Sequence, residues 1–158
     1  MGFGEAISAG FSNYVNFSDR ASRSEFWFWV LFCALGGIAA GVIDLLIGIP
    51  IIKTLFSLGT VVPYIAVAIR RLHDLDRTGW WWLLYFVPML LAGIFVVYYI
   101  FRAETNYWVA AACLFGVIQL ICWIVLLIWF CTRGTNGPNR FGPDPLAVTG
   151  LPNAPRVS

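Results

Sequence analysis

One short segment in the middle of the chain carries the side chains best suited to chemistry. It reads Arg70-Arg71-Leu72-His73-Asp74-Leu75-Asp76-Arg77-Thr78-Gly79-Trp80. A histidine next to a carboxylate suggests general acid–base catalysis by His73 and Asp74, or metal binding. His73 is the only histidine in the chain, so the ligand set for a metal is thin. We favour a structural interpretation, in which the arginines anchor a helix end at anionic headgroups while His73 and Asp74 bond to them or cap the next helix.

A second polar cluster reads Ser18-Asp19-Arg20-Ala21-Ser22-Arg23-Ser24-Glu25. Ser22 or Ser24 is suited to cap a helix, and Glu25 is favourable in a first helical turn. Arginine forks meeting carboxylates at such a surface either join helices to one another or hold a phosphate-bearing headgroup. Both interpretations give one set of candidate site residues: Arg20, Arg23, Glu25, Arg70, Arg71, His73, Asp74, Asn139 and Arg140.

Asp44 is the one carboxylate inside a long apolar run. Charge is costly at the centre of a bilayer but cheaper near a helix end, where we place Asp44. We expect it to pair with Lys53 or to stay protonated, as part of the structure. The alternative is a place on a proton or ion pathway.

Several function classes lack sequence support. The chain contains no phosphate-binding G-x-x-x-x-G-K-[ST] loop, no H-E-x-x-H and no G-x-S-x-G, so we expect a protein that is not an enzyme and has no cofactor. The four cysteines lie within apolar runs and are expected to be buried hydrophobes rather than metal ligands. A net charge of only +2, with no long basic block, argues against nucleic-acid binding.

The elements that must position these residues are membrane helices. The composition is 60% hydrophobic and 11% charged, whereas a soluble domain carries about 25% charged residues. About 20 apolar residues are needed to cross a bilayer, and four runs meet that need: Phe26 to Ile49, Ile51 to Ile69, Trp80 to Phe101 and Tyr107 to Cys131. We predict an all-α polytopic protein with four transmembrane helices in two antiparallel hairpins, the first closed at Pro50.

The remaining segments complete the expected domain organisation. Residues 1–25 carry an apolar stripe, Phe3, Ile7, Phe11, Tyr14 and Val15, which predicts a short amphipathic helix lying in the membrane interface or packed on the bundle. Residues 26–132 form the transmembrane domain. In it, Gly37-x-x-x-Gly41, flanked by Ala34 and Ala40, offers a face for close packing against another helix of the chain or a second copy. Residues 133–158 are rich in Gly, Pro and Asn and predict a tail without a helix.

The distribution of basic residues predicts the orientation. Lys53 and Arg102 lie on one side of the four predicted spans. The other side carries Arg20, Arg23, Arg70, Arg71, Arg77, Arg133, Arg140 and Arg156. Because short cytoplasmic loops retain basic residues, we expect both termini and the middle loop in the cytoplasm.

Three motifs together resemble a known family. They run from Phe17 to Trp27, from Arg70 to Asp74 with Thr78-Gly79-Trp80-Trp81, and from Gly137 to Pro145. In this order they resemble the YhaH-like family of small bacterial inner-membrane proteins, a numbered domain of unknown function. The resemblance implies a bacterial plasma-membrane location and a multi-helix fold, but no reaction. The matching residues are Arg20, Arg23, Glu25, Arg70, Arg71, His73, Asp74, Gly79, Trp80, Asn139, Gly142 and Pro145.

Three functional hypotheses follow. The leading one is a non-enzymatic membrane protein whose arginine-rich cytoplasmic surface binds anionic lipid headgroups or a partner protein. The second is a small transporter or channel that uses Asp44. The third is an enzyme acting on a lipid headgroup with His73 and Asp74. The sequence specifies neither a substrate nor an oligomeric state.

Overall fold

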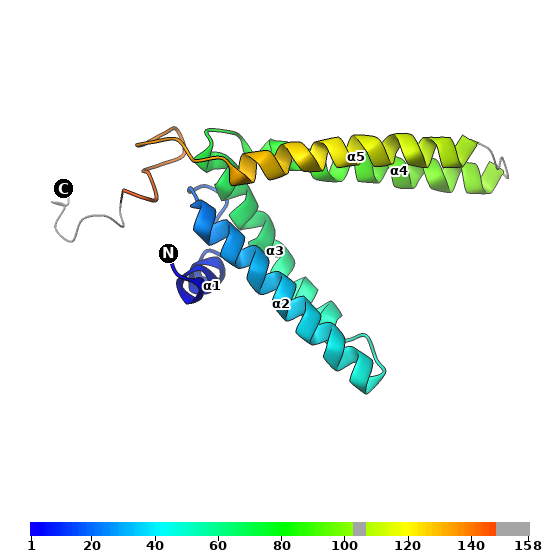
Figure 1. Ribbon diagram of the computed structural model, residues 1–158, viewed down its shortest axis with the longest axis horizontal. Coiled ribbons are helices and arrows are strands. Elements are labelled where there is room, and N and C mark those ends of the chain that lie inside the picture. Colours follow the sequence, from blue (N-terminus) through cyan, green and yellow to red (C-terminus); the bar gives the residue numbers. More distant parts are fainter. Residues whose placement is uncertain (103–106, 148–158) are drawn as a thin grey trace. The chain divides into compact units, whose positions relative to one another are not determined.

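The computed structural model describes residues 1–102 and 107–147 of the chain (Figure 1). Their elements are α1 (Phe3–Ser12), α2 (Arg23–Ile47), α3 (Ile52–Asp74), the 3-10 helix η1 (Gly79–Trp82), α4 (Leu83–Arg102) and α5 (Tyr107–Cys131). The end of the predicted tail, including Arg156, lies outside the described residues. The chain forms two compact units: Met1–Gly79 with the segment that begins at Arg133, and Trp80–Thr132.

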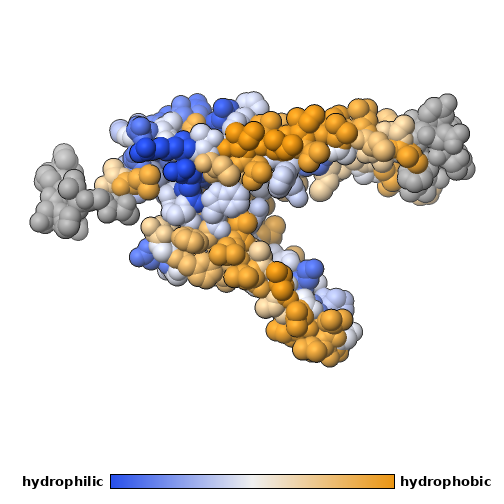
Figure 2. Space-filling model, in the orientation of Figure 1, coloured by the Kyte–Doolittle hydropathy of each residue, from blue (hydrophilic) through white to orange (hydrophobic). Residues whose placement is uncertain are grey.

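The prediction of an all-α fold with four membrane spans is confirmed. Within the described residues, four helical segments are long and apolar enough to cross a bilayer: Arg23–Ile47, Ile52–Asp74, Gly79–Tyr98 and Val109–Cys131. Figure 2 shows hydrophobic surface along α5 and along the distal parts of α2 and α3. Large apolar side chains such as Leu45, Leu46 and Leu90 are exposed there, as expected of helices whose solvent is lipid.

In the first unit, α2 and α3 run side by side and are joined by a short turn (Figure 1). Helix α2 begins at the N-cap Ser22, whose hydroxyl accepts the N–H of Glu25 at 3.3 Å. It ends at Gly48, which has a positive φ of 79° that glycine adopts without strain. The expectation that Ser22 or Ser24 caps this helix is therefore confirmed, with Ser22 in that role.

Asp44 caps α3 from the last turns of α2. Its carboxylate oxygens accept the backbone N–H of Ile52 at 2.8 Å and of Lys53 at 2.9 Å, while the N-cap residue Ile51 supplies no side-chain bond. The sequence left open whether Asp44 pairs with Lys53 or stays protonated. In the structure it accepts the backbone N–H of Lys53. The first turn of a helix has free N–H donors and a positive dipole end, both of which suit a carboxylate.

The close helix packing uses Gly36, which was not predicted, and Ala40, which flanks the predicted Gly37-x-x-x-Gly41 face. A Cβ at Gly36 would collide with the Phe56 ring on α3, and Ala40, one turn later, is buried. By contrast, a Cβ at Gly37 would meet nothing within 4 Å. The close approach of α2 to α3 therefore depends on Gly36 and Ala40, one helical position from the predicted Gly37-x-x-x-Gly41 face.

Helix α3 continues past its predicted end at Ile69 as far as Asp74. Residues 70–74 were expected to lie in the cytoplasmic loop, but all five are buried. Asp74 pairs with Arg20 and with Arg71 of the same helix, and Arg70 pairs with Glu25. The positive charge of Arg71 also suits the negative dipole end of a helix. A turn follows, in which Asp76 has a φ of 56°.

Helix α1 packs across the first turns of α2 (Figure 1). A Cβ at Gly10 would collide with the Trp29 ring, and Phe11 makes an edge-on contact with the same ring at 5.2 Å between centroids. The hydroxyl of Tyr14 donates to the carbonyl of Gly59 on α3 at 2.9 Å. Val15 is exposed. Contact between α1 and the membrane interface stays a prediction.

The second unit consists of η1, α4 and α5, with α4 packed along α5. Aromatic pairs join α5 to the other two elements: Phe115 contacts Phe95 of α4 at 5.4 Å, and Phe130 contacts Trp82 of η1 at 6.0 Å between ring centroids. These contacts bury apolar area without using any ionisable group.

Candidate functional site

The two predicted polar clusters and the tail meet in the first unit, where they form a polar cap. We define the polar cap as residues 18–25, 70–79 and 133–147. They come from the start of α2, the end of α3 with the following turn, and the segment after α5. Hydrophilic surface gathers over this region in Figure 2. The polar cap is the densest set of charged residues in the described chain.

Asp74 is the central acceptor of the polar cap. Its Oδ1 accepts from Nε and Nη2 of Arg20, at 3.1 and 2.8 Å, and its Oδ2 accepts from Nη1 of Arg71. Its backbone carbonyl accepts the N–H of Thr135 at 2.8 Å. Arg71 is 0% exposed, so this pair is desolvated. Asp74 therefore binds the start of α2, the end of α3 and the tail together.

Arg20 fixes the course of the tail. Besides Asp74, its guanidinium donates to the carbonyls of Thr135 and Gly137, each at 2.7 Å. A Cβ at Gly134 would collide with the Asp74 carboxylate. Glycine at position 134 therefore lets the chain pass close to Asp74 just before the contact at Thr135. The described part of the tail, residues 133–147, is consequently held against the start of α2 and the end of α3, although these residues contain no helix.

Glu25 and Arg70 form a second buried pair. Arg70 Nη1 donates to Glu25 Oε1 at 2.7 Å, and the side chains are 6% and 3% exposed for Glu25 and Arg70. The backbone N–H of Ala21 donates to the carbonyl of Arg70 at 3.0 Å. These bonds hold the N-terminus of α2 against the last turns of α3. Nε and Nη2 of Arg70 have no acceptor among the residues that the structure describes.

His73 is positioned by stacking rather than by Asp74. Its ring lies on the ring of Phe141, with centroids 3.8 Å apart and planes within 2° of parallel. Its Nδ1 lies 3.2 Å from the carbonyl oxygen of Asp19. Asn139 donates to the backbone carbonyl of His73 at 2.9 Å and to the hydroxyl of Thr135 at 3.0 Å. His73 and Asp74 are therefore neighbours in sequence with different partners.

The remaining predicted residues lie at the surface or elsewhere. Arg140 pairs with Asp76 at 3.0 Å, where the side chains are 56% and 48% exposed. Arg23 is exposed at the start of α2. Asp44 lies at the opposite end of the α2–α3 pair, so the structure does not bring it to the polar cap.

Several residues that make contacts in the polar cap were not among the predicted site residues, including Gly134, Thr135, Phe141 and Asp144. Asp144 accepts the backbone N–H groups of Leu146 at 2.9 Å and Gly137 at 3.0 Å, and these bonds lower the pKa of its carboxyl below the ordinary value. Its place within Gly-Pro-Asp-Pro was a turn signal. Gly134 gives no comparable signal, because its role depends on a carboxylate 60 positions earlier in the chain.

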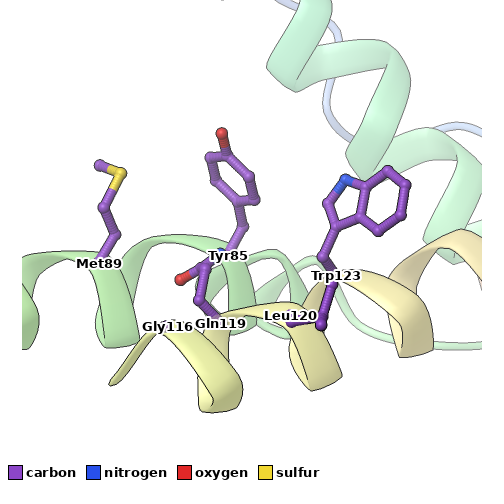
Figure 3. A pocket seen from close by; sticks show the side chains of 6 residues that line it. All are labelled: Tyr85, Met89, Gly116, Gln119, Leu120 and Trp123. Carbon is purple, nitrogen blue, oxygen red and sulfur yellow. The ribbon is translucent and has the colours of Figure 1, made fainter. Parts of the chain in front are cut away.

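The second unit contains a pocket of about 380 Å³ (Figure 3). Tyr85, Met89 and Trp123 project to one side of the α4–α5 pair, and the lining is completed by Gly116, Gln119 and Leu120. The side-chain amide oxygen of Gln119, Oε1, is buried and has no hydrogen-bond partner among the described residues. No carboxylate or histidine lines this pocket, so it offers no acid–base pair. Among residues 1–102 and 107–147, no three His, Cys, Asp or Glu side chains are placed to hold a metal ion.

Four long apolar helices with a polar cap at one end of the first pair define a polytopic helical membrane protein. The chain belongs to the family described as protein of unknown function (DUF805), whose model matches residues 14–143. The YhaH-like resemblance is thereby confirmed.

Three proteins of Escherichia coli (strain K12) illustrate the similarity. Inner membrane protein YhaI is 41% identical over 135 residues, covering 84% of this chain and 88% of YhaI. Inner membrane protein YhaH is 31% identical over 139 residues, covering 84% and 89%. The uncharacterized protein YiiR is 32% identical over 140 residues, covering 82% and 85%. No solved structure matches this chain. With its four candidate spans, this chain is a multi-pass protein of the bacterial inner membrane.

Proposed function

We propose that this protein is non-enzymatic and that its polar cap binds anionic phospholipid headgroups at the cytoplasmic face of the inner membrane. The observation that carries the proposal is a surplus of positive charge. The polar cap contains seven arginines and five carboxylates. Each carboxylate already accepts a bond: Asp19 from Asn16, Glu25 from Arg70, Asp74 from Arg20 and Arg71, Asp76 from Arg140, and Asp144 from backbone N–H groups. The arginines therefore outnumber the carboxylates, and the net positive charge of the polar cap favours an anionic partner.

The arrangement of the polar cap supports a binding role over catalysis. A catalytic carboxylate must be accessible to substrate and able to exchange a proton. Both oxygens of Asp74 are instead bonded to guanidinium groups, and the side chain is 6% exposed. The ring of His73 is covered by Phe141. Neither side chain has the freedom that acid–base chemistry on a headgroup requires.

The transport hypothesis loses its main sequence support. It rested on Asp44 as an intramembrane ionisable group. Both oxygens of Asp44 are bonded to the first N–H groups of α3, which is a helix-capping role. We therefore propose no transport activity.

Orientation is part of the proposal. Arginines of the polar cap meet an anionic leaflet only if the termini and the α3–η1 connection are cytoplasmic, as the excess of basic residues on that side favours. Anionic lipids in that leaflet contribute about 1 kcal/mol per nearby arginine.

The test uses the full chain in nanodiscs made from equal amounts of phosphatidylglycerol and phosphatidylcholine. Native mass spectrometry then counts the lipids retained by the protein, with Arg23→Gln/Arg133→Gln and Lys53→Gln alongside. Arg23 and Arg133 are exposed in the polar cap, while Lys53 is exposed at the other end of α2 and α3. We expect the wild type to retain phosphatidylglycerol preferentially, the arginine double variant to lose at least roughly fivefold of that preference, and Lys53→Gln to keep it.

Equal retention of the two lipids by the wild type would overturn the lipid proposal. So would a preference that the arginine double variant leaves unchanged. A partner protein that co-purifies stoichiometrically with the wild type and not with the double variant, without lipid preference, would assign the surface to protein binding instead.

A further inference from the structure

Arg70 differs from the other buried arginines in how its donors are used. In a guanidinium group, Nε–H and one N–H of Nη2 point in the same direction and form the two-donor edge that matches two oxygens of a carboxylate or phosphate. Arg20 directs this edge at Oδ1 of Asp74. Arg70 uses Nη1 for Glu25, and both atoms of its two-donor edge have no acceptor among the described residues.

Burial makes this edge energetically significant. Arg70 is 3% exposed, so bulk water does not solvate its guanidinium. An unsatisfied buried donor costs about 1–3 kcal/mol, and more when the donor carries charge. Arg70 has two such donors side by side. A fold that keeps them in place is stabilised strongly by any acceptor that fits against them.

The surroundings of the edge favour an anion. The N-terminus of α2 lies beside Arg70, since Ala21 N–H donates to the Arg70 carbonyl. The positive end of that 25-residue helix therefore adds to the charge of the guanidinium. Trp29 follows Glu25 by one turn on the same face of α2, and its buried Nε1–H also has no acceptor among the described residues. The groups left over are all donors.

We propose that the Nε–Nη2 edge of Arg70 is a phosphate-binding site, in which two oxygens of one phosphate group accept its parallel N–H bonds beside the N-terminus of α2. The site rests on the proposed function and gives it a position: the phosphodiester of an anionic phospholipid is one source of the group, and inorganic phosphate is the other. Because Arg70 is almost fully enclosed, the occupant exchanges slowly and stays with the protein through purification.

The experiment measures phosphorus bound per chain. The wild type, Arg70→Lys, Glu25→Gln and Arg140→Lys are purified in a phosphorus-free detergent and washed, and bound phosphorus is determined by phosphorus NMR and native mass spectrometry. Lysine keeps a charge that reaches Glu25 but has no two-donor edge. Glu25→Gln leaves the edge intact and removes the neighbouring carboxylate. Arg140→Lys makes the same change at an exposed pair.

We expect the wild type and Arg140→Lys to retain about one phosphate group per chain by the bidentate match. Glu25→Gln should retain at least as much, and Arg70→Lys should lose tenfold or more of the occupancy. A lipid mass on the protein identifies a headgroup. An inorganic phosphorus signal that rises saturably with added phosphate identifies the free anion. If Arg70→Lys does not fold, Glu25→Gln/Arg70→Gln removes both charges together and should show the same loss.

Two outcomes overturn the inference. One is a folded wild type that retains no phosphorus and binds none on addition of phosphatidylglycerol or phosphate. The other is equal occupancy in the wild type and Arg70→Lys. If lipid preference depends on Arg23 and Arg133 but not on Arg70, the site at Arg70 fails while the proposed function stands. If no anionic lipid is preferred at all and Arg70 binds only inorganic phosphate, the proposed function fails while the site stands.

Discussion

Asp74 accepts hydrogen bonds from two buried arginines, Arg20 and Arg71. Its negative charge is therefore stabilised by these two guanidinium groups rather than by water. Buried ion pairs contribute little net stability compared with apolar packing, but removing one partner leaves an uncompensated charge. Removing the Asp74 carboxylate would leave two uncompensated charges, those of Arg20 and Arg71. The same side chain therefore determines whether the start of α2, the end of α3 and the tail stay together.

Asp74→Asn should destabilise the first unit by about 3–5 kcal/mol, because two buried guanidinium groups then face a neutral amide. The measurement is unfolding of the detergent-purified protein, followed by proteolytic sensitivity of the tail. Asp76→Asn is the matched control, because it changes the same group two residues later in an exposed pair, where about 0–1 kcal/mol is expected. Similar effects of the two substitutions would argue against Asp74 as the central acceptor.

At the residue scale, the mixture of arginines and carboxylates in the sequence indicated ion pairs but not which residues pair. The structure joins Arg20 and Arg71 to Asp74, and Arg70 to Glu25. The pairing of Arg20 with Asp74 spans 54 positions, and no local pattern specifies it. Gly134 was missed for the same reason, since its constraint is the Asp74 carboxylate and not its own neighbours.

At the element scale, helix boundaries follow from which polar groups find partners. Helix α3 continues through Asp74 because its last charged residues find partners: Asp74 pairs with Arg20, and Arg70 pairs with Glu25. The tail donates hydrogen bonds to the last backbone carbonyls of the helix. Hydropathy alone ended this helix at Ile69, since charged residues normally stop an apolar run. At the other end of α3, Asp44 supplies the cap that Ile51 lacks.

Asp44→Ala should cost about 0.5–2 kcal/mol, the usual cost of losing a helix cap, because two first-turn N–H groups lose their acceptor. Asp44→Asn should cost less, since an amide oxygen still accepts one of these bonds. Thermal unfolding in detergent measures both. If the asparagine variant is as damaging as the alanine variant, the negative charge matters more than the cap, and the ion-pathway hypothesis regains support.

The contact between α2 and α3 gives a sharper comparison within one helix. Gly36→Ala should destabilise the pair by about 1–3 kcal/mol, because the added methyl group forces the Phe56 ring to move. Gly37→Ala should be neutral or stabilising by up to about 1 kcal/mol, since it meets nothing and favours a helix. The two variants are compared by thermal unfolding. A larger destabilisation by Gly37→Ala than by Gly36→Ala would indicate that α2 packs closely through the predicted Gly37 face instead.

At the scale of the whole molecule, the four spans were predictable because a helix that crosses lipid must be long and apolar. Such helices are directly visible in the sequence as long apolar runs. The locations of the polar cap and of Asp44 on opposite ends of α2 and α3 link the fold to orientation. Seven arginines lie in the polar cap, and Lys53 lies at the other end. The positive-inside rule then predicts a cytoplasmic polar cap.

Cysteine labelling checks this orientation. In a background with the four native cysteines replaced, Asn136→Cys places a thiol on the exposed surface of the polar cap, and Lys53→Cys places one at the start of α3. A membrane-impermeant maleimide added to spheroplasts should label position 53 within minutes and leave position 136 unlabelled until the membrane is opened. Labelling of position 136 in intact spheroplasts would place the polar cap outside, away from the anionic cytoplasmic leaflet. The surplus arginines would then lose the acceptors that the lipid proposal assigns to them.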